Sequence, residues 1–142
     1  MTIDDYAEIQ IPGLAEGYRV RANHVSGALG QAWQIAFTRA ARAETLRVLD
    51  LKRTYPDLPD GYETAEHLEA MIAWSSKVIE DALLGVLYPD DSLLDREASG
   101  QFVSRIGAQE QIMLALSMMR EVGRLPPQFR PPRAGVGDEG ES

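Results

Sequence analysis

The stretch from Thr64 to Leu87 constrains the fold of this chain more than any other feature. Apolar residues recur through it at the i, i+3, i+4, i+7 spacing of one wide helical face. These residues are Leu68, Met71, Ile72, Trp74, Val78, Ile79, Ala82, Leu83, Val86 and Leu87. Turn-forming sequences at 55–61 and 88–91 bound the stretch on both sides. We therefore predict one long central helix over 64–87, capped by Asp60 or Thr64, which the other elements must cover.

Two further elements are predicted before the central helix. Apolar and polar residues alternate in 8–11 and again in 18–21, with proline and glycine between them, which predicts a β-hairpin over 6–22. Two strands alone are marginally stable in water, so we expect the hairpin to pack on its own domain rather than on another chain. Ser26 is a suitable N-cap for a helix over 27–53.

The chain after the central helix predicts a short helical turn over 93–98. Asp91 or Ser92 would cap this turn, and Ser99 with Gly100 would end it. Three apolar residues follow whose element the pattern does not decide: Phe102, Val103 and Ile106.

A confident helical pattern covers 108–122, and Gly123 is suited to end that helix. Its apolar face comprises Ile112, Met113, Leu116, Met119 and Val122. Methionine fills gaps in cores but also serves adaptable binding surfaces. Core filling is the favoured interpretation, and the candidate partner contacts on this basis are Trp74, Met113, Met118 and Met119.

The last segment, 126–142, is rich in proline and glycine and carries one bulky aromatic residue, Phe129. Such a segment buries too little apolar surface to offset the entropy of ordering, so we predict a disordered tail. An extended tail could present Phe129 and Arg130 to a partner. The predicted fold is thus mostly α: a three-to-four-helix domain over 1–125 with a short N-terminal β-hairpin, followed by the tail.

The residues needed for chemistry are scarce. The chain has no cysteine, which excludes a disulfide, a thiolate nucleophile and a cysteine-ligated metal. Its two histidines are His24 and His67, and His67 with Glu63 makes only two ligands on one helical face. Phosphate-binding glycine loops and nucleophile-elbow motifs do not occur. We therefore predict no metal, no cofactor and no enzymatic activity.

The charge of the chain is strongly acidic, at −8 net, and eleven acidic and two basic residues fall within 54–98. This balance argues against nucleic acid and against an anionic membrane surface as partners. No apolar run approaches the ~20 residues of a membrane span. The first residues are acidic where a signal peptide is basic, so we expect a cytoplasmic protein.

The 76–125 region combines three features in order. An apolar helix over 76–87 closes on Tyr88-Pro89-Asp90-Asp91, an apolar spacer follows at 102–106, and polar residues at 109–111 open the last helix. This arrangement resembles the tail assembly chaperones of long-tailed bacteriophages. The resemblance implies a small, acidic, largely helical cytoplasmic protein without an active site. It also implies that the protein binds the tape-measure protein and recruits tail-tube subunits.

Two other functions stay open. One is a structural head–tail neck component that remains in a phage-like particle, and the other is a small helical DNA-binding regulator using Arg39, Arg42 and Arg47. Self-association into a homo-oligomer is also open.

Overall fold

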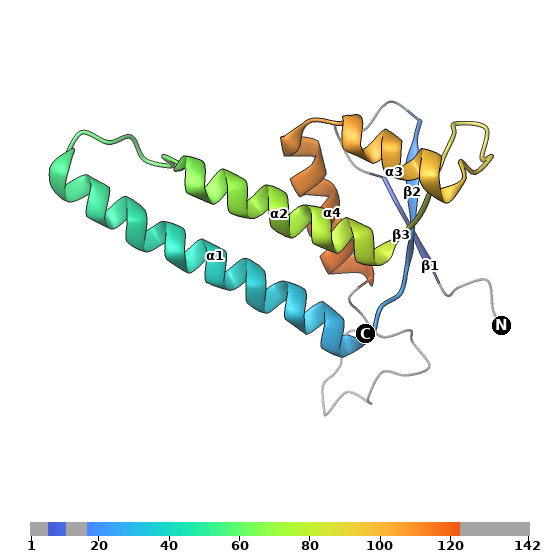
Figure 1. The fold of residues 1–142 in the computed structure, drawn as a ribbon, viewed down its shortest axis with the longest axis horizontal. Coiled ribbons are helices and arrows are strands. Elements are labelled where there is room, and N and C mark those ends of the chain that lie inside the picture. Colours follow the sequence, from blue (N-terminus) through green and yellow to red (C-terminus); the bar gives the residue numbers. More distant parts are fainter. Residues whose placement is uncertain (1–5, 11–16, 123–142) are drawn as a thin grey trace, which may run out of the picture.

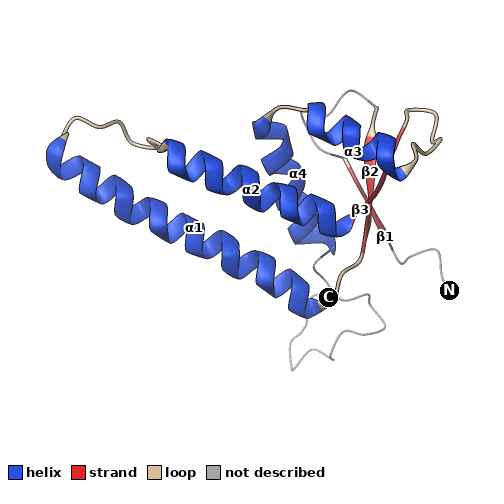
Figure 2. Ribbon diagram, in the orientation of Figure 1, coloured by secondary structure: helices blue, strands red, loops and turns tan. Residues whose placement is uncertain are grey.

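The computed structural model describes residues 6–10 and 17–122. Its elements in chain order are β1 (Tyr6–Ile9), β2 (Arg19–Asn23), α1 (Gly27–Thr54), α2 (Ala65–Ala82), β3 (Leu83–Leu87), α3 (Arg96–Arg105) and α4 (Ala108–Val122). Helices α1 and α2 form a long antiparallel pair, and α3, α4 and the sheet gather at one end of that pair (Figure 1). Figure 2 shows that helix dominates, so the predicted mostly-α fold with an N-terminal hairpin is confirmed. The predicted tail lies outside the described residues.

The N-cap residues at the starts of α1 and α2 are among those that the sequence predicts. Ser26 caps α1, its hydroxyl accepting a hydrogen bond from the Leu29 amide at 3.2 Å. Thr64, rather than Asp60, caps α2 and accepts from the His67 amide at 3.1 Å. The helix predicted over 108–122 is α4.

The predicted helix over 64–87 is wrong in its last turn. The α2 helix ends at Ala82, and Leu83–Leu87 forms β3, which pairs antiparallel with β2 through Val20 and Val86. A short continuous apolar run fits a buried strand as well as a buried helix, so periodicity alone cannot separate them. Gly85 allows Leu93 to pack closely on the strand, because a Cβ at position 85 would lie 2.8 Å from Leu93 Cδ1.

The predicted turn over 93–98 is also wrong in its bounds and its cap. Asp95, rather than Asp91 or Ser92, caps α3 and accepts a first-turn amide hydrogen bond at 2.8 Å. Ser99 and Gly100 lie inside this helix instead of ending it. Packing against β3 offsets the low helix propensity of these two residues.

The core lies where α2 and α4 pack together beside the sheet. The hairpin of β1 and β2 packs on its own domain, as expected, and β3 adds a third strand in the order β1-β2-β3. The start of α1 is tied to the end of α4 by a hydrogen bond from the Val25 amide to the Val122 carbonyl at 3.1 Å. No helix in the described part of the chain combines the length and apolar character that crossing a bilayer requires.

The free edge of β3 is closed by the start of α3. The Val86 amide donates to the Ser99 hydroxyl at 2.8 Å, and the Val86 carbonyl accepts from the Leu94 amide at 3.0 Å. Ser99 is fully buried. These contacts attach α3 to the sheet and satisfy an edge that would otherwise be open to pairing.

We expect Ser99→Ala to lower the free energy of unfolding by about 1–3 kcal/mol, because the buried Val86 amide loses its acceptor. Urea denaturation measures the loss. Ser104→Ala is the matched control, since the Ser104 hydroxyl is exposed and donates only within its own helix. Equal stability of the two variants would contradict the assigned role of Ser99.

Candidate protein-binding surfaces

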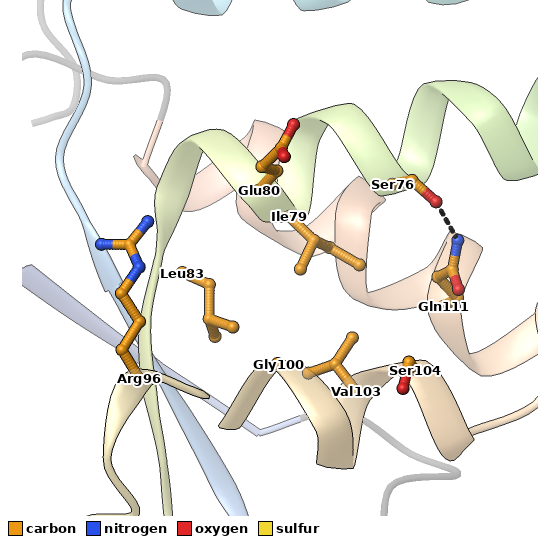
Figure 3. A pocket seen from close by; sticks show the side chains of 9 residues that line it. All are labelled: Ser76, Ile79, Glu80, Leu83, Arg96, Gly100, Val103, Ser104 and Gln111. Carbon is orange, nitrogen blue, oxygen red and sulfur yellow. Dashed lines mark hydrogen bonds between the residues drawn. The ribbon is translucent and has the colours of Figure 1, made fainter. Parts of the chain in front are cut away.

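A cleft opens between α2, α3 and the start of α4, with a volume of about 270 Å³. Figure 3 shows Ile79, Leu83 and Val103 converging on this space from α2, β3 and α3. Each of the three is nearly buried, with 5 to 7 % of its surface exposed. The floor of the cleft is therefore aliphatic and rigidly held by the core.

Polar groups surround this floor. Glu80 lies at the α2 side of the cleft, and Arg96 lies at the start of α3 (Figure 3). Gln111 closes a third side, where its side-chain amide donates to Ser76 Oγ at 2.9 Å. Gly100 leaves its side of the cleft open, because a Cβ at this position would meet no atom within 4 Å.

The volume and lining of the cleft indicate what it can bind. Pockets for drug-sized ligands span about 300–1,000 Å³, which is larger than this cleft. An aliphatic floor with a polar rim is instead suited to one large apolar side chain anchored from a partner protein. We assign no proton transfer or nucleophile to it, since its acidic group, Glu80, is exposed.

A second surface lies along the outer side of α1. Three large apolar side chains are exposed there, Ile35 at 50 %, Leu46 at 63 % and Leu49 at 54 %. Arg39 and Arg42 are exposed in the same stretch. Because Leu46 follows Ile35 by 11 positions and Leu49 follows Leu46 by 3, the three apolar side chains lie along one side of α1, and this surface is suited to contact with another polypeptide.

Inside the helix pair, a buried carboxylate joins α1 to the start of α2. Glu44 Oε2 accepts from the Thr64 amide at 2.8 Å, and Oε1 accepts from the Thr64 hydroxyl at 2.6 Å and from Arg47 Nε at 3.2 Å. Burial of the carboxylate acts to raise the pKa of Glu44, but the hydrogen bonds from Thr64 and Arg47 outweigh it and hold this pKa below its ordinary value. Glu44 is therefore a structural anion that fixes the loop between the helices.

Two tryptophans join the other end of the pair. The Trp74 indole donates to the Trp33 carbonyl at 2.9 Å, and the Trp33 indole donates to Asp81 at 3.1 Å. Lys77 adds a hydrogen bond to Asp81 at 2.8 Å. Burial acts to raise the pKa of Asp81, but these hydrogen bonds outweigh it and lower the pKa.

The structure does not bring the sequence-predicted contact residues together on one surface. Trp74 and Met118 are buried, and Met113 and Met119 pack partly buried against the core. The three methionines therefore lie in the core or against it, as the favoured interpretation of core filling expects. Phe129 and Arg130 lie outside the described residues.

The arginines proposed for DNA contact separate into two groups. Arg39 and Arg42 are exposed on α1, whereas Arg47 turns inward to Glu44. His67 lies in the first turn of α2. Over residues 6–10 and 17–122, no three acidic or histidine side chains are grouped so that they could hold a metal ion.

The cleft was missed by sequence reasoning because β3 and α3 form two of its sides, and both elements were predicted wrongly. The exposed apolar side chains of α1, which are Ile35, Leu46 and Leu49, fall within the helix predicted over 27–53. Their outward placement follows only from the position of α2. No protein-family model matches the chain, and comparisons with curated proteins and with solved structures found no match.

Proposed function

We propose that this protein is a non-enzymatic assembly factor that binds other proteins, and specifically a tail assembly chaperone of a long-tailed bacteriophage acting in the host cytoplasm. The observation that carries the protein-binding part of the proposal is the open aliphatic cleft between α2, α3 and α4. The phage assignment rests on the sequence resemblance over 76–125. Its proposed partners are a tape-measure protein and tail-tube subunits.

In the proposed binding step, the cleft receives one side chain of the partner protein. A helix of the partner would insert one large apolar side chain against Ile79, Leu83 and Val103. Burial of such a side chain contributes about 1.5–3 kcal/mol. Glu80 and Arg96 at the rim would orient the polar residues that flank the inserted side chain.

Filling the cleft at Gly100 is the sharpest test. We expect Gly100→Trp to weaken binding of a tape-measure fragment about 30-fold or more, since the indole would occupy the space of the anchor side chain. Isothermal titration calorimetry with purified proteins measures this loss.

Gly100→Ala is the matched control. It adds only a methyl group in open space, improves helix propensity by up to about 1 kcal/mol and should bind as the wild type does. Unchanged affinity in Gly100→Trp would overturn the cleft as the binding site. Absence of any binding to tape-measure and tail-tube proteins would overturn the chaperone assignment.

The exposed Arg39 and Arg42 favour one other candidate, a DNA-binding regulator. Such a protein would shift duplex DNA in a gel, with affinity falling steeply as salt rises. A neck component, by contrast, would be found in purified particles at fixed stoichiometry, where a chaperone would be absent.

A further inference from the structure

Two neighbouring arginines on α1 have no carboxylate partner in the part of the chain that the structure describes. The described Lys and Arg side chains without such a partner are Arg39, Arg42, Arg96, Arg105 and Arg120. Among them, only Arg39 and Arg42 lie three positions apart on one helix, a spacing that makes their side chains neighbours. Both are exposed. They therefore form a doubly positive site that an acidic ligand would neutralise.

The acidic residues of α1 leave this site positive. Glu44 lies on the opposite side of the helix, where it accepts from the Thr64 hydroxyl at 2.6 Å. Asp50 lies 3.7 Å from Arg53 and follows Arg42 by eight positions, which is about 12 Å along the helix axis. A carboxylate that pairs with Arg39 and Arg42 must therefore come from outside α1.

The two arginines belong to a shallow groove on the side of α1 that faces away from α2. Its lining residues are Gln31, Gln34, Ile35, Thr38, Arg39 and Arg42. Ile35 is 50 % exposed and offers an apolar contact. The two glutamines and Thr38 offer side-chain hydrogen-bond donors and acceptors to a passing backbone. The groove is suited to an extended segment in which an aliphatic residue precedes carboxylates.

The sequence contains such a segment at 134–142, which we call the acidic segment. It carries three carboxylates, Asp138, Glu139 and Glu141, and no cation. Val136 is its one branched aliphatic residue and stands before the carboxylates. Its glycines add no side chain that would hold the backbone away from a helix surface. The charge and the order of residues in the acidic segment therefore complement the groove.

The spacing of the acidic segment also matches the groove. In an extended chain, positions 138 and 139 follow position 136 by about 7 and 10 Å, at about 3.3 Å per residue. On α1, Arg39 and Arg42 follow Ile35 by about 6 and 11 Å, at about 1.5 Å per residue. With its aliphatic residue on Ile35, the segment therefore sets its first two carboxylates beside Arg39 and Arg42.

The acidic segment is tethered within reach of the groove. The Val25 amide donates to the Val122 carbonyl at 3.1 Å, so α4 ends beside the beginning of α1 (Figure 1). Ile35 lies ten positions beyond Val25, which is about 15 Å along the axis of α1. The residues 123–135 that join Val122 to Val136 span up to about 40 Å when extended. A tether of this length gives an effective concentration on the order of millimolar.

We infer that the acidic segment docks in the groove of α1 of its own chain, with Val136 on Ile35 and the carboxylates beside Arg39 and Arg42. The ion pairs lie at an exposed surface, so salt weakens the contact. An acidic partner that binds the same arginines has to displace the segment. This inference is independent of the proposed function, since the groove and the cleft share no residue.

Paramagnetic relaxation in the full chain tests the docking. The chain has no cysteine, so Ser142→Cys carries a nitroxide at a single place. Docking sets position 142 about 10 Å beyond Arg42, near Leu49. We expect the nitroxide to reduce the amide signals of 42–49 by about half or more, and about 1 M salt to restore them. The amide signals of α3, which carries two of the other cations without a partner, should keep their intensity.

Charge exchange tests which residues hold the segment. Arg39→Glu with Arg42→Glu should restore the amide signals of 42–49, and so should Asp138→Arg with Glu139→Arg. The chain with all four substitutions pairs the charges in reverse and should show the signal loss again. Far-UV circular dichroism checks that each variant stays helical.

Arg96→Glu with Arg105→Glu is the matched control, because it makes the same charge change at exposed positions of α3. This variant should keep the signal loss over 42–49. A loss that persists in Arg39→Glu with Arg42→Glu, or that centres on α3, would contradict the inference. So would a loss seen when an isotope-labelled chain without nitroxide is mixed with an unlabelled chain that carries it, since the segment would then dock on a second copy.

Discussion

Trp74→Ala is expected to lower the free energy of unfolding by about 3–5 kcal/mol. Trp74 is 8 % exposed, its ring lies 5.0 Å from that of Phe37, and its indole donates to the Trp33 carbonyl at 2.9 Å. The substitution leaves a cavity between α1 and α2 and removes the hydrogen bond that joins them. Because single domains are stable by only about 5–15 kcal/mol, the loss should appear as a large shift of the urea midpoint.

Trp74→Phe is the graded control. It keeps an aromatic ring beside Phe37 but loses the donor to Trp33, so an intermediate loss of about 1–2 kcal/mol is expected. The contrary outcome is a Trp74→Ala variant with unchanged stability and weakened partner binding. That result would support the sequence-based interpretation of Trp74 as a partner contact.

Glu44→Ala is expected to cost about 2–4 kcal/mol, since the Thr64 amide and hydroxyl and the Arg47 guanidinium all lose an acceptor. Glu44→Gln should cost less, because its amide oxygen can still accept one of these hydrogen bonds. Urea denaturation at neutral pH measures both losses. The loop between α1 and α2 should show faster hydrogen exchange in each variant.

The contribution of Glu44 to the free energy of unfolding is also expected to depend on pH. The pKa of Glu44 is lower in the folded protein than its ordinary value of 4.5, so the ionised group stabilises the fold at higher pH. This contribution is complete above the ordinary pKa and is lost as pH falls through the lowered one. The stability difference between wild type and Glu44→Gln should therefore shrink below about pH 4.5.

Asp50→Asn is the matched control for the pH experiment, as its carboxylate is 80 % exposed on the same helix. Its stability difference from wild type should stay near zero across the acidic range. If the free energy of unfolding depended on pH in the same way in the wild type and in Glu44→Gln, Glu44 would not stabilise the fold as an anion.

The sequence by itself determined the elements whose signals are local. Ser26 and Thr64 each place a side-chain oxygen three residues before an open helix amide, and the periodic segment of α4 has matching bounds. The alternation in the hairpin is local too, and it predicted the β1–β2 pairing. Caps and periodicity act over one or two turns, which is why they can be read without the fold.

Only the tertiary structure decided whether Leu83–Leu87 is helix or strand, because an apolar run becomes a strand when a neighbouring strand can pair with it. The strand also presents the buried Val86 amide, which donates a hydrogen bond to the Ser99 hydroxyl. This bond holds α3 against β3, and α3 extends beyond the predicted turn. The cleft and the buried Glu44 bring together residues 20 or more positions apart in chain order, such as Leu83 with Val103 and Glu44 with Thr64, and no local pattern reports such proximity. Side chains that pack between distant segments are placed by the fold, whereas the start of a helix is placed by its own first turn.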